Sequence, residues 1–213
     1  LINTPNIYYS NPHESFNYLL SYNKYKIVER YISYFSNLKQ FDTINTLINK
    51  RKYRYINKLI KNKTFDIVKS ENFTSFYQIL KKSKKKFNTK PTHSLEEIKK
   101  LHALFPNNIK LLITKKNNSI VGGVLLFYVN KKTCLVFYNV VKNTEQKSQL
   151  ASLQMYYAML NAVQNRCTLI DFGVSHMPQL SNPLIPKPSL IQFKEHFGGQ
   201  GCMREIYRKD LIC

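Results

Sequence analysis

The chain has 213 residues, of which 43% are hydrophobic, so it can form one domain with a packed core. Its 33 basic and 12 acidic side chains give a formal net charge of +21. No apolar run approaches the roughly 20 residues of a membrane span, which argues against a transmembrane segment. We expect no signal peptide. Because the sequence does not begin with Met, we expect it to be part of a longer protein.

The large positive charge favours polyanionic partners such as nucleic acid, phosphate-bearing cofactors or anionic membranes. A solvated basic surface is the other explanation, and charge alone does not choose between them. The four cysteines, Cys134, Cys167, Cys202 and Cys213, form no C-x-x-C pair and have no zinc-finger spacing to histidine. We therefore predict reduced thiols, no metal site and a cytoplasmic protein.

The first half of the chain predicts alternating helices and strands. Apolar residues recur at helical spacing in four segments, which cover residues 13–23, 42–62, 72–87 and 92–106. Strand-like alternation is present at residues 25–36 and 64–70. The fourth helix has a capping box at Ser94 and Glu97, which fixes its start.

The helix predicted at 42–62, with Asp42 or Thr43 as its N-cap, has a basic polar face without an acid. Its cations are Lys50, Arg51, Lys52, Arg54, Lys58 and Lys61. Residues 50–63 therefore suit tRNA, another polyanion or peripheral contact with an anionic membrane. A solvated helix face is the alternative.

The second half predicts an antiparallel meander followed by a crossover. The three strands of the meander cover residues 109–116, 119–129 and 133–141. A helix at 144–166 then leads to an apolar strand at 167–173, and this β-α-β step should be parallel. In that helix we expect buried Leu150, Leu153, Met155, Met159, Leu160 and Val163. A Pro-rich loop, a helix and a last strand follow at residues 177–188, 189–199 and 202–211.

The strand at 167–173 ends in Asp171-Phe172-Gly173, a triplet that holds magnesium in protein kinases. A kinase also needs a Gly-rich phosphate loop and an H-R-D catalytic loop upstream of this triplet. The first glycine of this chain is Gly122, and no H-R-D is present. The kinase interpretation is therefore excluded, and Asp171 needs another role.

Six segments in this order resemble the Gcn5-related N-acetyltransferase (GNAT) fold, and within it the Fem-type branch, which includes peptidoglycan aminoacyl transferases. They are "KRKYRYINKLIKN" (50–62), "FYQIL" (76–80), "KPTHSLEEIKKLHALFP" (90–106), "SIVGGVLLFY" (119–128), "LIDFGVS" (169–175) and "LIQFKEHFGGQ" (190–200). The resemblance implies an α/β fold with a mixed, mostly antiparallel sheet, a β-α-β crossover and flanking helices. It places a GNAT-like acyltransferase domain at 45–213, and residues 1–44 become an N-terminal extension or the remainder of an upstream segment.

The resemblance implies transfer of an acyl or aminoacyl group, from acyl-CoA or aminoacyl-tRNA, to an amine acceptor. The donor-binding residues would then be Val140, Val141, Lys142, Lys147, Ser148 and Gln149. GNAT acetyltransferases usually carry a Gly-rich pyrophosphate loop here, where backbone N–H groups hold phosphates. This loop has no glycine, which argues against tight coenzyme A binding. Fem-type members often lack the loop as well, because some use aminoacyl-tRNA.

Direct acyl transfer needs an amine that loses its proton, a stabilised oxyanion and two substrates held together. In this fold the donor carbonyl lies where two parallel strands separate. The residues expected to line that cleft and contact substrate are Tyr138, Asn139, Val140, Asp171, Gly173, Ser175 and Phe193.

The resemblance implies that Lys194, in the F-K-E motif, stabilises the developing charge, although a solvated helix lysine is the other interpretation. Asp171 could accept a proton, bind the amine, cap the following loop or pair with Lys194, and we expect these two side chains to lie near each other. His176 is the histidine next to the cleft and a candidate base. The alternative to an enzyme is a degenerate GNAT-like module that uses its basic face to bind nucleic acid or a larger assembly.

Overall fold

The computed structural model describes residues 1–11, 13–39, 44–86, 88–177, 182 and 184–210. Seven strands form one sheet in the order β2-β3-β4-β5-β6-β1-β7. The strands are β1 (Lys26–Asn37), β2 (Asp66–Ser70), β3 (Ile109–Lys116), β4 (Ser119–Tyr128), β5 (Thr133–Val141), β6 (Leu169–Val174) and β7 (Gln200–Arg208). Every neighbouring pair is antiparallel except β5 and β6, so the predicted mixed sheet and parallel crossover are confirmed.

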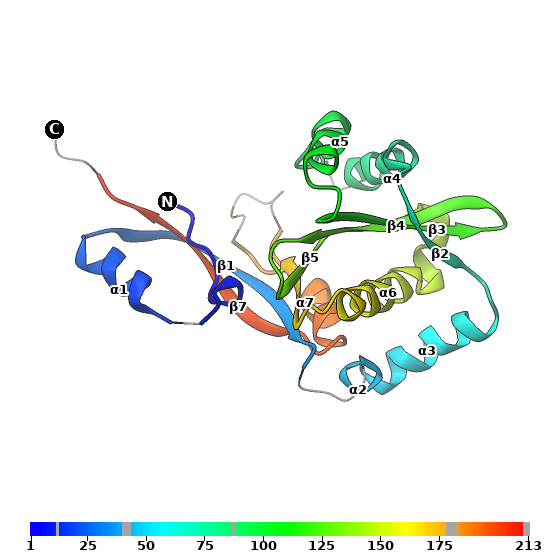
Figure 1. Ribbon diagram of the computed structural model, residues 1–213, viewed down its shortest axis with the longest axis horizontal. Coiled ribbons are helices and arrows are strands. Elements are labelled where there is room, and N and C mark those ends of the chain that lie inside the picture. Colours follow the sequence, from blue (N-terminus) through cyan, green and yellow to red (C-terminus); the bar gives the residue numbers. More distant parts are fainter. Residues whose placement is uncertain (12, 40–43, 87, 178–181, 183, 211–213) are drawn as a thin grey trace.

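Helices cover both faces of this sheet (Figure 1). The α-helices are α1 (Ser15–Tyr22), α2 (Ile44–Leu47), α3 (Lys50–Lys61), α4 (Phe73–Lys85), α5 (Leu95–Leu104), α6 (Leu150–Gln164) and α7 (Pro188–Glu195), and the 3₁₀ helices are η1 (Asn6–Tyr8) and η2 (Asn143–Ser148). One core lies between the sheet and α6, with α2, α3 and α7 around it. A second core lies between the sheet and α4 and α5 on the other face.

The meander from β3 to β5 forms as its sequence predicts. Asn117 and Asn118, between β3 and β4, both have positive φ (48° and 63°), which suits the right-handed twist of a tight hairpin. The Ser94–Glu97 capping box is present at the start of α5. Cys134, Cys167 and Cys202 are free, as expected, whereas Cys213 lies outside the described residues.

The strand β1 lies inside the sheet, between β6 and β7. Its antiparallel pairing with β7 runs from Lys26 and Arg208 to Phe35 and Gln200. Residues near the start of the chain therefore supply an interior strand of the same sheet. The domain boundary that we expected at residue 44 stays a prediction.

The single helix predicted at 42–62 is wrong, because α2 ends at Leu47 and α3 starts at Lys50. Asn49 causes the break: its backbone is not helical, and its side chain accepts hydrogen bonds from the N–H groups of Arg51 and Lys52. An asparagine that caps a helix in this way starts a new helix rather than continuing the old one. The N-cap predicted at Asp42 or Thr43 lies outside the described residues.

The helix predicted at 144–166 also divides, at Gln149, whose φ is +62°. The face of α6 toward the sheet includes Ala158 and Ala162, whereas Leu160 is only partly buried and Val163 is 44% exposed. Our prediction is therefore wrong for Val163, whereas Leu160 is partly buried and packs against the core. Val163 lies on a different side of the helix from Ala158 and Ala162, which are fully buried.

Replacing Asn49 by alanine should lower the free energy of unfolding by about 1 kcal/mol, because the first N–H groups of α3 lose their acceptor. Urea unfolding measures this change. Asn62→Ala, at the exposed C-terminal end of the same helix, is the control and should change stability less. Equal effects of the two substitutions would show that the Asn49 cap does not fix the start of α3.

Candidate functional site

The parallel strands β5 and β6 separate soon after they meet. Their pairing joins Thr133 to Leu169, Cys134 to Ile170 and Leu135 to Asp171. Beyond Leu135, β5 continues to Val141 without pairing to β6. A register shift in β5 at this point, opposite Leu125 and Leu126 of β4, indicates a β-bulge, which bends a strand locally. The separation that we predicted between these two strands is confirmed.

Two amide side chains link α6 to the sheet, near the part of β5 that is not paired with β6. Asn139 donates from Nδ2 to the carbonyl oxygen of Ala151, at 3.0 Å. Gln154, which is fully buried, hydrogen-bonds through its amide to Oγ1 of Thr114, at 2.8 Å. Gly122 lies against this amide, because a Cβ atom there would be 2.4 Å from Nε2 of Gln154. Asn139 therefore links β5 to α6, and its predicted contact with substrate stays a prediction.

Lys194 reaches the end of β6 from α7, and only 3% of its surface is exposed. Its Nζ donates to the carbonyl oxygens of Gly173 and Val174, both at 2.7 Å, and to Oγ of Ser175 at 2.8 Å. These three acceptors use all the protons of an ammonium group. Burial lowers the pKa of Lys194 to about 7; the Asp171 carboxylate opposes this shift, and the Arg204 guanidinium adds to it. Lys194 is therefore a buried, well-ordered group and not a solvated helix lysine.

Asp171 is fully buried on β6. Its Oδ2 accepts hydrogen bonds from the Tyr8 hydroxyl and the Arg204 guanidinium, and its Oδ1 accepts from the N–H of Gly173 at 2.6 Å. It therefore fixes the backbone of Gly173 near the end of β6, and its predicted role as a cap of the following loop stays a prediction. Its ion pair is with Arg204, and among the described residues it forms none with Lys194, so the alternative of a direct pair is wrong.

Asp171 and Lys194 nevertheless both hydrogen-bond to the backbone of Gly173. Asp171 accepts from the N–H of Gly173, while Lys194 donates to the carbonyl oxygen of Gly173. Gly173 has a φ of +72°, which favours glycine, and a Cβ atom there would have no neighbour within 4 Å. Asp171 and Lys194 therefore hold the two polar groups of the Gly173 backbone, beside which there is open space.

His176 follows Ser175 in the same loop. Its ring packs against Tyr31, with centroids 4.7 Å apart, and its buried Nδ1 has no hydrogen-bond partner among the described residues. Burial lowers the pKa of His176, and the nearby Lys194 lowers it further. A neutral imidazole beside Lys194 is the result, and a neutral imidazole can accept a proton.

Three other predicted contact residues lie in the cores. Tyr138 is buried beneath α4 and α5, where its hydroxyl accepts from the N–H of Thr92 at 2.9 Å. Val140 belongs to the same core. Phe193 packs on Phe197, with ring centroids 5.2 Å apart. These residues support the strands and α7, and their predicted contact with substrate stays a prediction.

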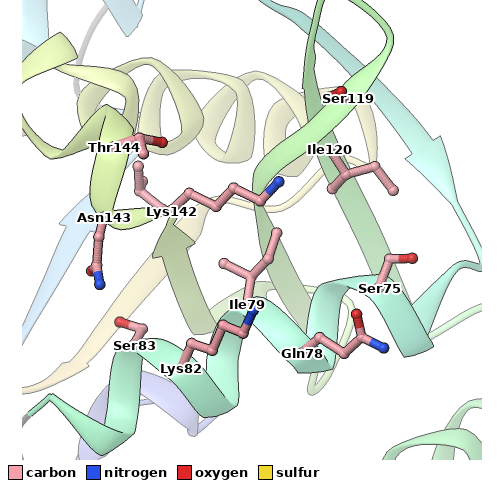
Figure 2. Close-up of a pocket in the computed structure, with 11 residues that line it drawn as sticks. Ser75, Gln78, Ile79, Lys82, Ser83, Ser119, Ile120, Lys142, Asn143 and Thr144 are labelled. Carbon is pink, nitrogen blue, oxygen red and sulfur yellow. The ribbon is translucent and has the colours of Figure 1, made fainter.

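A cavity of about 460 Å³ opens where β5 ends (Figure 2). Most of its lining residues, which come from α4, β4, the end of β5 and the start of η2, are polar or basic, and none of them is acidic. The lining residues are Ser75, Gln78, Ile79, Lys82, Ser83, Ser119, Ile120, Val141, Lys142, Asn143 and Thr144. Figure 2 shows the side chain of Lys142 extending toward the strand that carries Ile120. This surface can accept an anionic group such as a phosphate.

Two of the six predicted donor-binding residues, Val141 and Lys142, line this cavity. Lys147 is exposed elsewhere on η2, and the Ser148 hydroxyl donates to the carbonyl oxygen of Glu145 at 2.6 Å. Gln149 accepts from Nζ of Lys52 at 3.0 Å. The 3₁₀ turn of η2 directs these three side chains away from the cavity.

Our sequence reasoning missed Tyr8, Arg204 and Gln154. Tyr8 and Arg204 reach Asp171 from opposite ends of the chain, and no local pattern marks them. Gln154 did carry a signal, because it is a polar residue in the buried part of an apolar helix. Among the described residues, no group of three or more His, Cys, Asp and Glu could hold a metal ion. No helix among them is long and apolar enough to cross a membrane.

The fold is found in known structures, although no family model and no curated protein matches the sequence. FemX superposes with a TM-score of 0.69 over 87% of this chain, at 11% identity. L-PGS from Bacillus licheniformis has a TM-score of 0.63 over 91% of this chain, at 10% identity. The C-terminal domain of a protein from Agrobacterium fabrum, described as a lysylphosphatidylglycerol synthetase, has a TM-score of 0.61 over 89%, at 11% identity.

These similarities confirm a GNAT-type fold of the kind found in FemX. The chain spans 66%, 65% and 64% of the lengths of FemX, L-PGS and the Agrobacterium domain, respectively, or just under two thirds of each. At such low identity the likeness concerns the fold, so the chemistry has to be argued from the residues of this chain.

The lowered pKa of Lys194 predicts a pH-dependent stability. The folded protein releases this proton near pH 7, while the unfolded chain keeps it to about 10.5, so the unfolded chain binds more protons between these values. The free energy of unfolding should therefore rise with pH above 7, by at most about 1.4 kcal/mol per pH unit. In the Lys194→Met variant, this rise in the free energy of unfolding with pH should be absent. Urea unfolding of both proteins from about pH 6.5 to 9.5 gives the difference, and parallel curves would contradict the assignment.

Proposed function

We propose that this protein transfers an acyl or aminoacyl group from a phosphate-bearing donor, acyl-CoA or aminoacyl-tRNA, to an amine. The observation that carries the proposal is the acid-free cavity with Lys82 and Lys142, which lies at the end of β5 where β5 has separated from β6. Two lysines, several hydroxyls and no carboxylate suit a phosphate group. The separated strands leave room for the rest of the donor to lie beside β5.

Transfer proceeds by direct attack of the acceptor. The amine nitrogen forms a bond to the donor carbonyl carbon, and the amine loses a proton. The tetrahedral intermediate then collapses, the C–S bond of a thioester or the C–O bond of an ester breaks, and the leaving sulfur or oxygen takes up a proton. No covalent bond to the protein is required. The protein has to position the two substrates, stabilise the developing oxyanion and transfer protons.

In its protonated form, Lys194 supplies the positive charge for this step. It is held at the end of β6, next to the open space at Gly173, and a fixed cation there stabilises the oxyanion as it develops. Its hydrogen bond to the Ser175 hydroxyl is the one most easily exchanged, because a hydroxyl can rotate away, whereas the two backbone carbonyls stay in place. His176 is the proton acceptor, since its imidazole is neutral and lies in the same loop.

Asp171 has an indirect role: it positions the backbone of the site and is not the base. Its two oxygens are occupied by Tyr8, Arg204 and the N–H of Gly173. It therefore positions Gly173, whose carbonyl in turn holds Lys194. The acceptor is an amine-bearing molecule. In the proposed complex, the donor extends from the cavity at the end of β5 to Gly173.

Lys142→Gln should weaken the binding of the correct donor about tenfold or more, because a charge-assisted contact to phosphate is lost. Titrations with a fluorescent acyl-CoA and with aminoacyl-tRNA, carried out separately, measure this and identify the donor. The matched control is Lys147→Gln, which removes the same charge five residues further along, within η2, at a position that does not line the cavity, whereas Lys142 is the residue just before η2. A loss that is equal in both variants would indicate general charge attraction and not a phosphate site.

Lys194→Ala should lower kcat by about a hundredfold, the usual effect of removing one group that stabilises an oxyanion. Donor affinity should stay the same, because Lys194 does not line the cavity. Stopped-time product assays and donor titrations separate the two quantities. Turnover that survives this substitution would remove Lys194 from the mechanism. A wild-type protein that binds donor or nucleic acid without turnover would support the alternative of a binding module.

A further inference from the structure

The helix α1 presents an apolar face to solvent. Tyr18, Leu19 and Tyr22 are 68%, 51% and 72% exposed, whereas Leu20 on the inner side is 6% exposed. The rings of Tyr18 and Tyr22 stack, with centroids 6.3 Å apart. A helix on a protein surface normally points polar residues outward, whereas α1 exposes these three large apolar side chains as well.

The exposed apolar surface continues beyond the helix. Ile27 and Val28, at the start of β1, are 40% and 44% exposed, and Ile2 is 78% exposed. In Figure 1, α1 and the adjoining part of the β1–β7 ribbon extend away from the body of the molecule, at the end far from α3. A flat partner can therefore reach α1 without meeting the other helices. Large apolar side chains exposed together, as on α1, are typical of an interaction site.

The charges around α1 identify the kind of partner. The helix itself, SFNYLLSY, contains no charged residue. Lys24 and Lys26 follow its C-terminal end and are exposed, and Lys26 is paired in register with Arg208 of β7. Tyrosines and leucine beside lysines form the combination that lies in the interfacial layer of a bilayer, where cations meet lipid phosphates.

We propose that the outward face of α1 docks on an anionic lipid bilayer, with Tyr18, Leu19 and Tyr22 in the interfacial layer and Lys24 and Lys26 against lipid phosphates. A second copy of the chain fits this face less well. It carries the same net charge of +21 and would bring the same cations to the contact, whereas an anionic bilayer neutralises them. The surface is separate from the cavity and from Lys194, so it stands independently of the proposed transfer reaction.

The chain contains no tryptophan, so a single introduced indole reports on its own surroundings. Leu19→Trp places it on the proposed surface. Leu104→Trp places it on α5 at a leucine that is 62% exposed, and serves as the matched control. Each protein is mixed with vesicles of phosphatidylcholine alone, or of phosphatidylcholine with one third phosphatidylglycerol. Tryptophan emission and its quenching by brominated acyl chains are then measured, and circular dichroism shows that both variants are folded.

With anionic vesicles, the emission of the Leu19→Trp protein should shift to the blue and be quenched. The Leu104→Trp protein and vesicles of phosphatidylcholine alone should give neither effect. Adding Lys24→Gln and Lys26→Gln to the Leu19→Trp protein should weaken vesicle binding roughly thirtyfold, from about 1 kcal/mol per cation.

Three results would overturn the proposal. The first is binding to anionic vesicles without a change in the emission of the Leu19→Trp protein, because another basic surface such as α3 would then carry the contact. The second is an equal shift in the Leu104→Trp protein. The third is a blue shift of the Leu19→Trp protein without vesicles that grows with protein concentration, because a second copy of the chain would then cover α1.

Discussion

The early end of pairing between β5 and β6 is the constraint on which the rest of the site depends. Only Thr133, Cys134 and Leu135 of β5 pair with β6. Two parallel strands that stayed paired over their full length would leave no space between them. Here β5 has a bulge just beyond the paired residues and is hydrogen-bonded to α6 through Asn139, while the position of a Cβ atom on Gly173 of β6 is open.

The charged groups at this space form a connected set. Tyr8 and Arg204 hold Asp171, Asp171 holds the N–H of Gly173, and Lys194 holds the carbonyl oxygens of Gly173 and Val174. Burial alone would make an isolated lysine or aspartate very unfavourable, so each needs these partners. The same contacts fix the loop that leads to His176. A lysine held beside a neutral imidazole suits the acyl transfer that we propose.

Regular patterns in the sequence predicted most of the fold, because periodicity and turn residues act locally. The meander, the parallel crossover and the separation of β5 and β6 followed from apolar runs and from the resemblance to GNAT proteins. The breaks at Asn49 and Gln149 did not, because both lie within continuous helical patterns and depend on single backbone conformations. Lys194 and Gly173 could be named from a motif. Tyr8 and Arg204 could not, because the partners of Asp171 are 163 and 33 residues away along the chain, and only the sheet order brings them together.

The central claim is that a phosphate-bearing donor lies along the free part of β5, with its carbonyl at Gly173. A crystal structure of the protein with a stable thioether analogue of acyl-CoA, or with a 3′-aminoacyl-adenosine nucleotide, tests this claim most directly. We predict that the phosphate lies against Lys142, and that the carbonyl occupies the space between β5 and Gly173, close to Lys194. Electron density for the donor that lies outside the space between β5 and β6 would contradict this claim.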